Sequence, residues 1–520
     1  MIDTVALREK VLDLAIRGKL VPQDPNDEPA SVLLERIRAQ KQQMVKDGKL
    51  KAKDIKDDSV IFVGEDNLHY EKFADGTVKR IEDEIPFEIP EGWSWERLSN
   101  LASFSGGKTP STSNREYWEG NILWVTSKDM KSKYIDASLL MISEKGLEQM
   151  QLYPENTLLL VTRSGILRHT IPVAILKKPA TINQDLKAIM PYIPKLEEYI
   201  YICIKGMESR LILEYTKAGA TVENINFDAF QKILLPIPPE NQIQHIIDAT
   251  NDADEVISKL KIDQEDLIDI IGKAKSKILD LAIRGKLVPQ NPDDEPASVL
   301  LERIRAEKEE LIRQGKIKRD KKESTIFKGE DNSYYEKMGE MISCIDDEIQ
   351  FEIPNSWEWC TITNISEIIM GSSPDGLSIQ PIGNGVEFHQ GKIHFTDKYI
   401  DLSDKSTNEP SKIAPSNSVL LCVRAPVGEV NITQREICIG RGLSAIYPYD
   451  SISSEFLFYW LQTYKSYLNL QATGSTFVAI TADTVKGIKI PLPPIDEQKR
   501  ILQAIESLYA QLNNIEKSLS

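Results

Sequence analysis

The sequence predicts an α+β protein in which two similar globular α/β domains are separated by a long antiparallel coiled coil. Three observations predict this fold: an internal repeat, heptad patterns beside each repeat, and mixed strand-like and helix-like runs within each repeat. The chain has 520 residues, a length that favours several domains. Because both copies follow one order of elements, we expect a pseudo-two-fold relation between them.

The internal repeat is clearest in a 31-residue segment. Val11 to Lys41 and Ile278 to Lys308 differ at only four positions, and looser similarity follows both segments. Each copy then has a W-x-W motif and ends in a proline cluster, which stops a strand. The repeat predicts five parts: an N-terminal helical arm (1–81, repeated by 268–345), a first globular domain (82–240), a central helical spacer region (241–345), a second globular domain (346–495) and a C-terminal spacer helix (496–520).

Two spacer segments have apolar residues in alternating steps of three and four, which is a heptad pattern. The central helix is expected from about Gln242 to Ile283, roughly 60 Å long. The pattern predicts a coiled coil, and its alternative is an ordinary core helix. The expected seam residues are Ile257, Leu260, Leu267, Ile271, Ala274, Ile278, Leu281, Ile501, Ile505, Leu508, Leu512 and Ile515, with Gln264 as one polar position.

The composition, 41% hydrophobic and 27% charged, is typical of a globular protein. No apolar run is long enough for a membrane span, and no basic-then-apolar start indicates a secretory signal. The five cysteines and five histidines lack the spacing of a disulfide framework or a zinc site. We therefore expect no metal, no membrane contact and a location in the reducing cytoplasm.

The net charge of −16 argues at first sight against binding to nucleic acid. The charge is uneven, however, because the segment from Asn241 to Gln350 has 18 Lys+Arg and 25 Asp+Glu. The segment from Leu101 to Glu240 is nearly neutral, with 16 and 15. The acidic residues are therefore concentrated in the spacer, and a large phosphate-contact contribution would have to come from a partner.

Strand-like runs in both globular domains end at an arginine. Residues 157–162 and 418–423 predict strands, as do residues 121–126, and the first two runs are followed directly by Arg163 and Arg424. A side chain at a strand end beside a turn is exposed and well held. We expect these two arginines to lie at corresponding places.

A second matched pair of segments is 183–189 and 440–446, whose apolar positions agree while their polar positions differ. This pattern is expected of one scaffold that reads two different base sequences, because Gln suits adenine and Arg suits guanine in the major groove. A solvated surface role is the alternative for every candidate, and Arg168 with His169 is also consistent with a structural pair. The candidates for DNA contact are Lys108, Thr126, Ser127, Lys128, Lys131, Arg163, Arg168, His169, Gln184, Gln390, Lys392, Arg424, Arg441, Ser475 and Thr476.

Motifs of catalysis are not found in the sequence. Gly371 and Gly376 have the spacing of a phosphate-binding loop, but Leu377 stands where lysine would be required. There is no Asn-Pro-Pro-aromatic run, no glycine-rich cofactor turn and no cluster of carboxylates suited to a nuclease metal. We therefore expect no catalytic residue, and a reading protein of this kind would require enzymatic partners.

The order helix, domain, long helix, domain, helix resembles the specificity subunits of type I restriction-modification enzymes. The stretches that carry the resemblance include residues 126–131, 163–170, 423–428, 437–443 and 474–477, together with the proline-rich segment that leads to Gln498. In place of Gly-Ser-Thr-Phe at 474–477, the first copy has Gly-Ala-Thr-Val at 219–222. The resemblance covers nearly the whole chain.

The resemblance implies two target recognition domains, each reading one half of a bipartite, asymmetric site on double-stranded DNA, with the helices setting the gap. It also implies two methyltransferase subunits, which methylate adenine with S-adenosylmethionine, and restriction motor-nuclease subunits, which use ATP and Mg²⁺. No cofactor would bind this chain itself.

Two other functions are consistent with parts of the sequence. A coiled-coil scaffold with two protein-binding domains would explain the acidic net charge. An enzyme with an unrecognised site in one domain is a weaker alternative.

Overall fold

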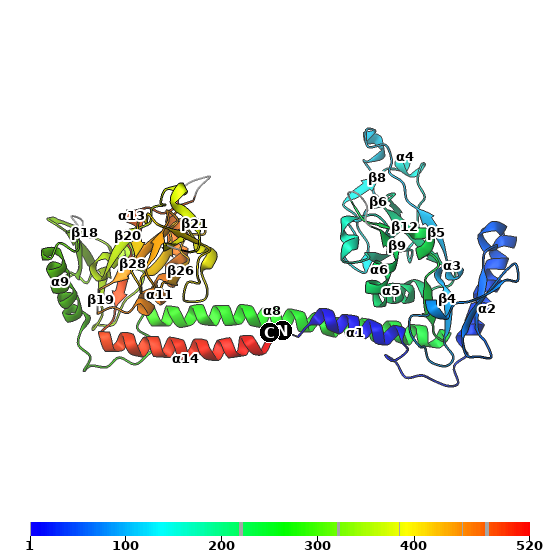
Figure 1. The fold of residues 1–520 in the computed structure, drawn as a ribbon, viewed down its shortest axis with the longest axis horizontal. Helices are drawn as coiled ribbons and strands as arrows, with labels where there is room; N and C mark the ends of the chain where they lie inside the picture. The colour runs from blue at the N-terminus through cyan, green and yellow to red at the C-terminus, as the bar shows by residue number, and fades with distance from the viewer. Residues whose placement is uncertain are drawn as a thin grey trace. The chain divides into compact units, whose positions relative to one another are not determined.

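The computed structural model describes residues 2–217, 222–319, 323–383, 385–449, 451–473 and 478–519. The chain divides into two compact units, an N-terminal unit (Ile2–Asp263) and a C-terminal unit that begins at Gln264. Each unit combines β-sheets with helices, and each contains one globular domain of the repeat (Figure 1). The mixed α/β character and the duplication predicted from the sequence are therefore present.

The N-terminal unit is built on two packed sheets. One has the strand order β5 (Ala102–Gly106), β12 (Leu186–Pro191), β9 (Leu158–Val161), β10 (Val173–Leu176) and β7 (Tyr134–Ile135). The other has the order β11 (Ala180–Ile182), β6 (Ile122–Val125) and β8 (Leu140–Ile142). Two-stranded ladders join β4 (Ser94–Arg97) to β15 (Leu234–Ile237) and β13 (Thr216–Lys217) to β14 (Asn224–Ile225).

The apolar runs predicted as strands are buried on both faces. In β9, Leu158 and Leu160 belong to the core beneath the helices, whereas Leu159 and Val161 belong to the core between the sheets. This alternation follows from the two-residue period of a strand. The helices of the unit are α1 (Thr4–Ile16), α2 (Ala30–Lys46), α3 (Leu98–Leu101), α4 (Glu144–Leu147), α5 (Leu196–Gly206), α6 (Glu208–Tyr215) and α7 (Phe227–Phe230).

The C-terminal unit repeats this plan. Its first sheet has the order β20 (Ser366–Met370), β28 (Leu443–Pro448), β25 (Val419–Cys422) and β26 (Val430–Ile432). Its second has the order β21 (Ile379–Pro381), β23 (Lys405–Thr407), β22 (Val386–His389), β27 (Ile437–Ile439) and β24 (Ile413–Ala414), and β19 (Glu358–Thr361) pairs with β29 (Lys489–Leu492). The helices are α9 (Ala297–Arg313), α10 (Ile362–Ile365), α11 (Ser454–Thr463), α12 (Lys465–Gln471), α13 (Ala482–Lys486) and α14 (Ile495–Leu519).

A small three-stranded sheet beside α2 and α9 completes each unit. In the N-terminal unit it contains β1 (Ser59–Val63), β2 (His69–Phe73) and β3 (Val78–Arg80). In the C-terminal unit it contains β16 (Ser324–Lys328), β17 (Tyr334–Met338) and β18 (Met341–Cys344). The arm that the sequence predicted to be helical therefore contains two α-helices, α1 and α2, and an antiparallel sheet.

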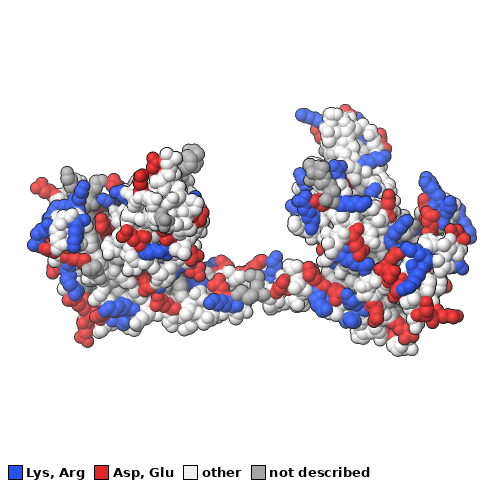
Figure 2. Space-filling model, in the orientation of Figure 1, with Lys and Arg blue, Asp and Glu red and all other residues white. Residues whose placement is uncertain are grey.

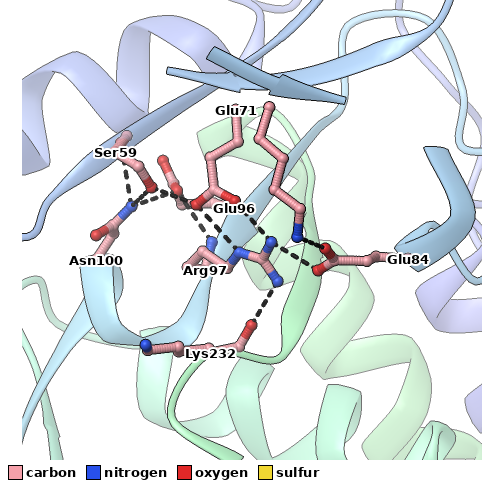
Figure 3. Close-up of polar contacts among 8 residues, drawn as sticks. Ser59, Glu71, Glu84, Glu96, Arg97, Asn100 and Lys232 are labelled. Atoms are coloured by element: carbon pink, nitrogen blue, oxygen red, sulfur yellow. Dashed lines mark hydrogen bonds and ion pairs between the residues drawn. The ribbon is translucent and has the colours of Figure 1, made fainter. Parts of the chain in front are cut away.

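A buried ion network attaches the first small sheet to its domain. Arg97 on β4 lies between Glu71 of β2 and Glu84, with N–O distances of 2.7 Å to each (Figure 3). In the C-terminal unit the same role belongs to Lys489 of β29, which contacts Glu336 and Glu348. The two cations lie on opposite strands of equivalent ladders. Arg97 is on β4, opposite Leu234 of β15, whereas Lys489 is on β29, opposite Thr361 of β19.

The predicted central helix is present as α8 (Glu240–Ile283), 44 residues long. In the N-terminal unit α1 contacts its first part, with Arg8 bonded to Asp254 and Ser258. In the C-terminal unit α14 lies alongside its last part, where Tyr509 donates to the carbonyl of Lys275 and Glu516 pairs with the Lys275 ammonium (Figure 1). Among the described helices, none combines the length and the apolar content that crossing a membrane requires.

The predicted seam positions of α8 alternate between buried and half-buried as far as Ile271, whereas near the end of the helix Leu279 and Ala282, outside the predicted seam, are buried. Ile257 and Ile271 are buried, as is the polar Gln264, whereas Ile262 and Ile270 outside the seam are more than half exposed. On α14, Ile501 and Ile505 are buried, Leu508 and Leu512 are half-buried and Ile515 is 45% exposed. Leu260, Leu267, Ala274, Ile278 and Leu281 are half-buried.

Candidate nucleic-acid interface

Four strand ends meet at one edge of the N-terminal unit. The end of β5 pairs with the start of β12 (Gly106 opposite Lys187), and the end of β9 pairs with the same start (Val161 opposite Leu186). The parallel strands β6 and β11 end there together, because Val125 lies opposite Ile182 and β11 leads directly to β12. The loops after these strands contain every candidate residue of the first domain.

Backbone contacts hold these loops tightly together. The amide of Lys108 donates to the carbonyl of Ile182 at 3.0 Å, and the amide of Asn183 donates to that of Val125 at 3.0 Å. A Cβ on Gly107 would lie 2.1 Å from the carbonyl oxygen of Asn183, so only glycine permits this approach. The candidate side chains therefore project from closely packed backbone.

Several exposed candidates of the first domain are cations. Lys108, Lys128, Lys131 and Arg163 are exposed, and none forms an ion pair with another described residue. Exposed, unpaired cations at one sheet edge are suited to contact phosphates or base edges. Gln184 and His169 are exposed in the same group of loops, and Ser127 is half-buried.

Three candidates have partners within the protein. Thr126 donates from its hydroxyl to Asp129 at 2.8 Å, which closes the turn after β6. Arg168 pairs with Glu223 and holds the pKa of that carboxyl below its ordinary value, so the partner that the structure gives to Arg168 is Glu223. The carbonyl oxygen of Gln184 accepts from the hydroxyl of Thr109, a contact that orients its amide group.

The C-terminal unit has the same construction. The ends of β20, β25 and β27 meet the start of β28, and β22 ends in parallel with β27. The amide of Gly440 donates to the carbonyl of His389, as Asn183 does to Val125, and Gly371 approaches the carbonyl of Gly440 as closely as Gly107 approaches that of Asn183. The two matched sequence segments are thus structurally equivalent.

The candidates of the second domain are exposed at this edge. They are Gln390, Lys392, Arg424 and Arg441, and of these only Lys392 has an ion pair, at 3.5 Å to Glu429, within the described residues. Ser475 and Thr476 lie outside the described residues.

Arg163 and Arg424 occupy equivalent places, as the sequence predicted. Each follows a buried strand, and each forms an isolated antiparallel bridge, Arg163 with Asn224 and Arg424 with Ala479. The preceding residues also correspond, since Thr162 donates to the carbonyl of Asp185 and Val423 to that of Gly442. The two side chains are therefore presented by one backbone geometry.

The sequence analysis missed the residues that connect these loops to the rest of each domain. Thr109 and Glu223, which orient Gln184 and Arg168, have no recognisable motif. Lys133 and Lys398, described below, begin a Lys-Tyr-Ile-Asp tetrapeptide that occurs in both units and was a usable signal.

Neither unit shows a concentrated field of one sign in the view of Figure 2, where acidic and basic side chains alternate over both. Within the described part of the chain, no three His, Cys, Asp or Glu side chains gather as a metal site requires. The interface is thus a polar surface with a few unpaired cations.

Fold and surface together define a duplicated reading module, in which equivalent loops carry different side chains. The sequence profile described as the type I restriction modification DNA specificity domain matches residues 90–261 and 354–520, more than half of the chain. The chain belongs to this family.

Relatives extend over the whole length. The type I restriction enzyme EcoAI specificity subunit of Escherichia coli is 26% identical over 578 residues, covering 98% of this chain and 89% of the relative. The EcoEI specificity subunit, also of Escherichia coli, is 26% identical over 582 residues, covering 99% and 90%. A chain from a structural study of complex assembly in the type I restriction-modification system has the same fold, with a TM-score of 0.54, 19% identity and coverage of 84% of this chain and 94% of that chain.

Proposed function

We propose that the chain is the DNA-specificity subunit of a type I restriction-modification complex, in which each recognition domain reads one half of a bipartite, asymmetric target. The main supporting observation is that the loops at the equivalent sheet edges of the two units have the same backbone contacts but present different exposed side chains at 183–189 and 440–446. One scaffold with two sets of side chains is what reading two different half-sites requires.

Individual contacts follow from hydrogen-bonding chemistry. Gln184, with its amide oriented by Thr109, suits adenine, whereas Arg441 at the equivalent place suits guanine. Arg163 and Arg424 are base-contact candidates, and the exposed lysines, with Lys392, suit phosphates. Ser127, His169 and Gln390 complete the described part of the surface that we assign to DNA. Ser475 and Thr476, which lie outside the described residues, remain sequence-based candidates.

The long helices set the gap between half-sites in this proposal. α8 leaves the first domain and α14 lies beside its last part, and their buried seam positions support an antiparallel coiled coil. A helix has a fixed rise per residue, so its length defines a distance along DNA.

Two methyltransferase subunits would dock on the segment that is nearly identical in both copies. Identical residues of this segment include exposed ones, such as Lys19 and Lys286 or Glu35 and Glu302. Substitutions at exposed positions usually change stability little, so the fold alone does not require this identity. A partner that binds twice would require it.

In this proposal the catalytic reactions of the complex are performed by its other subunits. The methyltransferase subunits would use S-adenosylmethionine, and the restriction subunits would use ATP and Mg²⁺, in the cytoplasm. Assays of the isolated chain for methyl transfer or DNA cleavage are expected to give no product, and a product would favour an enzyme instead.

The proposed function is tested by sequencing the methylome of a host that expresses the chain with its methyltransferase. We expect a two-part adenine motif with a fixed gap. Modification of an ungapped motif, or none above the host background, would contradict the proposal and favour a scaffold that binds proteins.

Docking is tested by charge reversal at Glu35 and Glu302. The double variant Glu35→Arg/Glu302→Arg should lose co-purifying methyltransferase, and each single variant should retain one subunit, as measured by native mass spectrometry. Glu340→Arg, at an exposed position where the copies differ, is the control. Two bound subunits in the double variant would exclude this surface.

A further inference from the structure

A Lys-Tyr-Ile-Asp tetrapeptide lies at the same place in both units. In the N-terminal unit it begins at Lys133, whose carbonyl accepts from the amide of Ile175 at 2.8 Å. In the C-terminal unit it begins at Lys398, whose carbonyl accepts from the amide of Ile432 at 2.9 Å. The neighbouring residues on both sides differ, so the shared tetrapeptide marks a shared requirement.

Lys133 joins three elements of its unit. Its ammonium lies 3.1 Å from Glu198 of α5 and 2.8 Å from the side-chain oxygen of Asn251 of α8. It also lies over the rings of Tyr134 and Tyr201, while the Tyr134 hydroxyl donates to Glu198 at 3.0 Å. The side chain is 19% exposed, so the contact is largely shielded from solvent.

Lys398 makes the equivalent contacts in the C-terminal unit. Its ammonium lies 2.5 Å from Glu455 of α11 and 2.9 Å from Glu506 of α14, and Tyr399 donates to Glu455 at 2.8 Å. The ammonium also lies over the ring of Tyr459. In both units one lysine therefore links a strand of the recognition domain to the long helix that follows that domain.

Each long helix has another polar attachment near its start. The indole of Trp93 donates to Gln242 of α8, and that of Trp357 donates to Glu497 of α14. These helix positions precede Asn251 and Glu506 by nine residues, about 13 Å along a helix. Two attachments at that separation fix the direction of the helix relative to its domain, whereas one would fix only a point.

The apolar core supports the start of α8 more than its continuation. Ile243, Ile246 and Ile247 belong to the core of the domain, but the contact of Lys133 with Asn251 lies beyond them. In the C-terminal unit Tyr509 extends the apolar contact, packing edge-on against Tyr459. The lysine contact therefore contributes more to holding the long helix against its domain in the N-terminal unit than in the C-terminal unit.

We propose that Lys133 and Lys398 are positioning residues that hold each recognition domain at a fixed angle on its long helix and so restrict the gap length that the protein accepts. This inference rests on the proposed function. Without the lysine contact, the helix of the N-terminal unit would be held only near its start, so the first domain would tolerate half-sites one base pair closer or farther apart. In the C-terminal unit the packing of Tyr509 against Tyr459 would reduce this effect.

The test uses the full chain with its methyltransferase and a plasmid set in which the gap of the native motif is changed by one base pair in either direction. Lys133→Met and Lys398→Met remove the charge and keep the side-chain length. We expect methylation at the altered gaps, relative to the native gap, to rise about threefold or more in Lys133→Met. The rise in Lys398→Met should be smaller, because Tyr509 still packs against Tyr459. Lys133→Arg, which keeps the charge, should remain closer to the wild type.

Two further variants separate positioning from stability. Asn251→Ala removes only the helix side of the contact and should broaden the gap profile in the same direction. Lys79→Met, which removes an exposed lysine from a surface pair with Glu84, should leave the profile unchanged. An unchanged profile, or an equal loss at every gap, in the Lys133 and Lys398 variants would overturn the inference. A wild-type chain without any gapped motif would contradict the proposed function instead.

Discussion

The arginine that follows each buried strand is the DNA-contact candidate whose placement the structure defines most directly. Arg163 and Arg424 are exposed, have equivalent backbone bridges and have no ion pair within the described residues. Because no ion pair with a described residue occupies their guanidinium groups, both arginines suit the proposed contact with DNA.

Arg163→Ala should weaken binding to the half-site read by the first domain by about 1–3 kcal/mol and leave the other half-site unaffected. Arg424→Ala should show the reverse pattern. Competition binding with oligonucleotides mutated in one half-site at a time measures both. Equal weakening for every sequence would identify a phosphate contact instead.

A half-buried carboxylate in the second domain makes stability depend on pH. Burial by itself raises the pKa of Glu387, but hydrogen bonds from Arg435, the amide of Ser403 and His389 lower it to about 2. A carboxyl whose pKa is lower in the folded state stabilises the fold above its unfolded pKa and loses that contribution as the pH falls.

Between pH 5.5 and pH 3, Glu387 should therefore contribute a loss of about 2 kcal/mol in the free energy of unfolding of its domain. Glu387→Gln should reduce the pH dependence by that amount, measured by hydrogen exchange of β22 peptides in urea titrations. Glu409→Gln, which removes an exposed carboxyl of the same domain, is the control. Equal pH dependence in wild type and Glu387→Gln would refute the assignment.

At the scale of elements, the repeat attaches its small sheets with one pair of carboxylates and two different cations. Glu71 and Glu336 both accept from a serine hydroxyl at 2.6 Å, so the carboxylate site is preserved. The cation comes from β4 in one unit and from the partner strand β29 in the other. For the cation, neither the residue type nor the strand is preserved; only the position of the positive charge beside the carboxylates is maintained.

This exchange predicts a rescue. Arg97→Thr should cost about 3 kcal/mol, because it leaves the buried Glu71 without a counter-ion. Adding Leu234→Lys should restore at least half of that loss, since it reproduces the arrangement of Thr361 and Lys489. Urea titrations of the wild type and of both variants measure the difference.

The matched control is Lys79→Thr, which removes an exposed partner of Glu84 and should cost less than about 1 kcal/mol. If Leu234→Lys adds no stability to the Arg97→Thr variant, the two cation positions are not interchangeable.

At the scale of the molecule, a net charge of −16 limits the affinity of the isolated chain for DNA, which is also negatively charged. Affinity for duplex DNA falls as the salt concentration rises, and each phosphate that the protein neutralises makes the plot of log affinity against log salt steeper by about 0.9. Few cations at each reading edge lack an internal partner, so the isolated chain should bind weakly with a shallow slope. The complex with methyltransferase should bind more tightly with a steeper slope, as fluorescence anisotropy at several salt concentrations would show. Equal slopes would contradict a partner contribution to phosphate contact.

The sequence by itself determined the duplication, the long central helix and the strands that precede Arg163 and Arg424, because repeats, heptads and continuous apolar runs are local patterns. It did not reveal the small sheets of the arms, whose strands are short and mostly exposed or half-buried.

Only the tertiary structure decided which side chains meet. Sheet register brings Lys108, Arg163 and Gln184, distant in the chain, to one edge. Among the described residues Arg163 has no ion-pair partner, while Arg168 is paired with Glu223. The contacts of Lys133 with α5 and α8 depend likewise on packing between elements far apart in sequence. A local pattern records the period of an element, whereas partners are chosen by the geometry in which the elements pack.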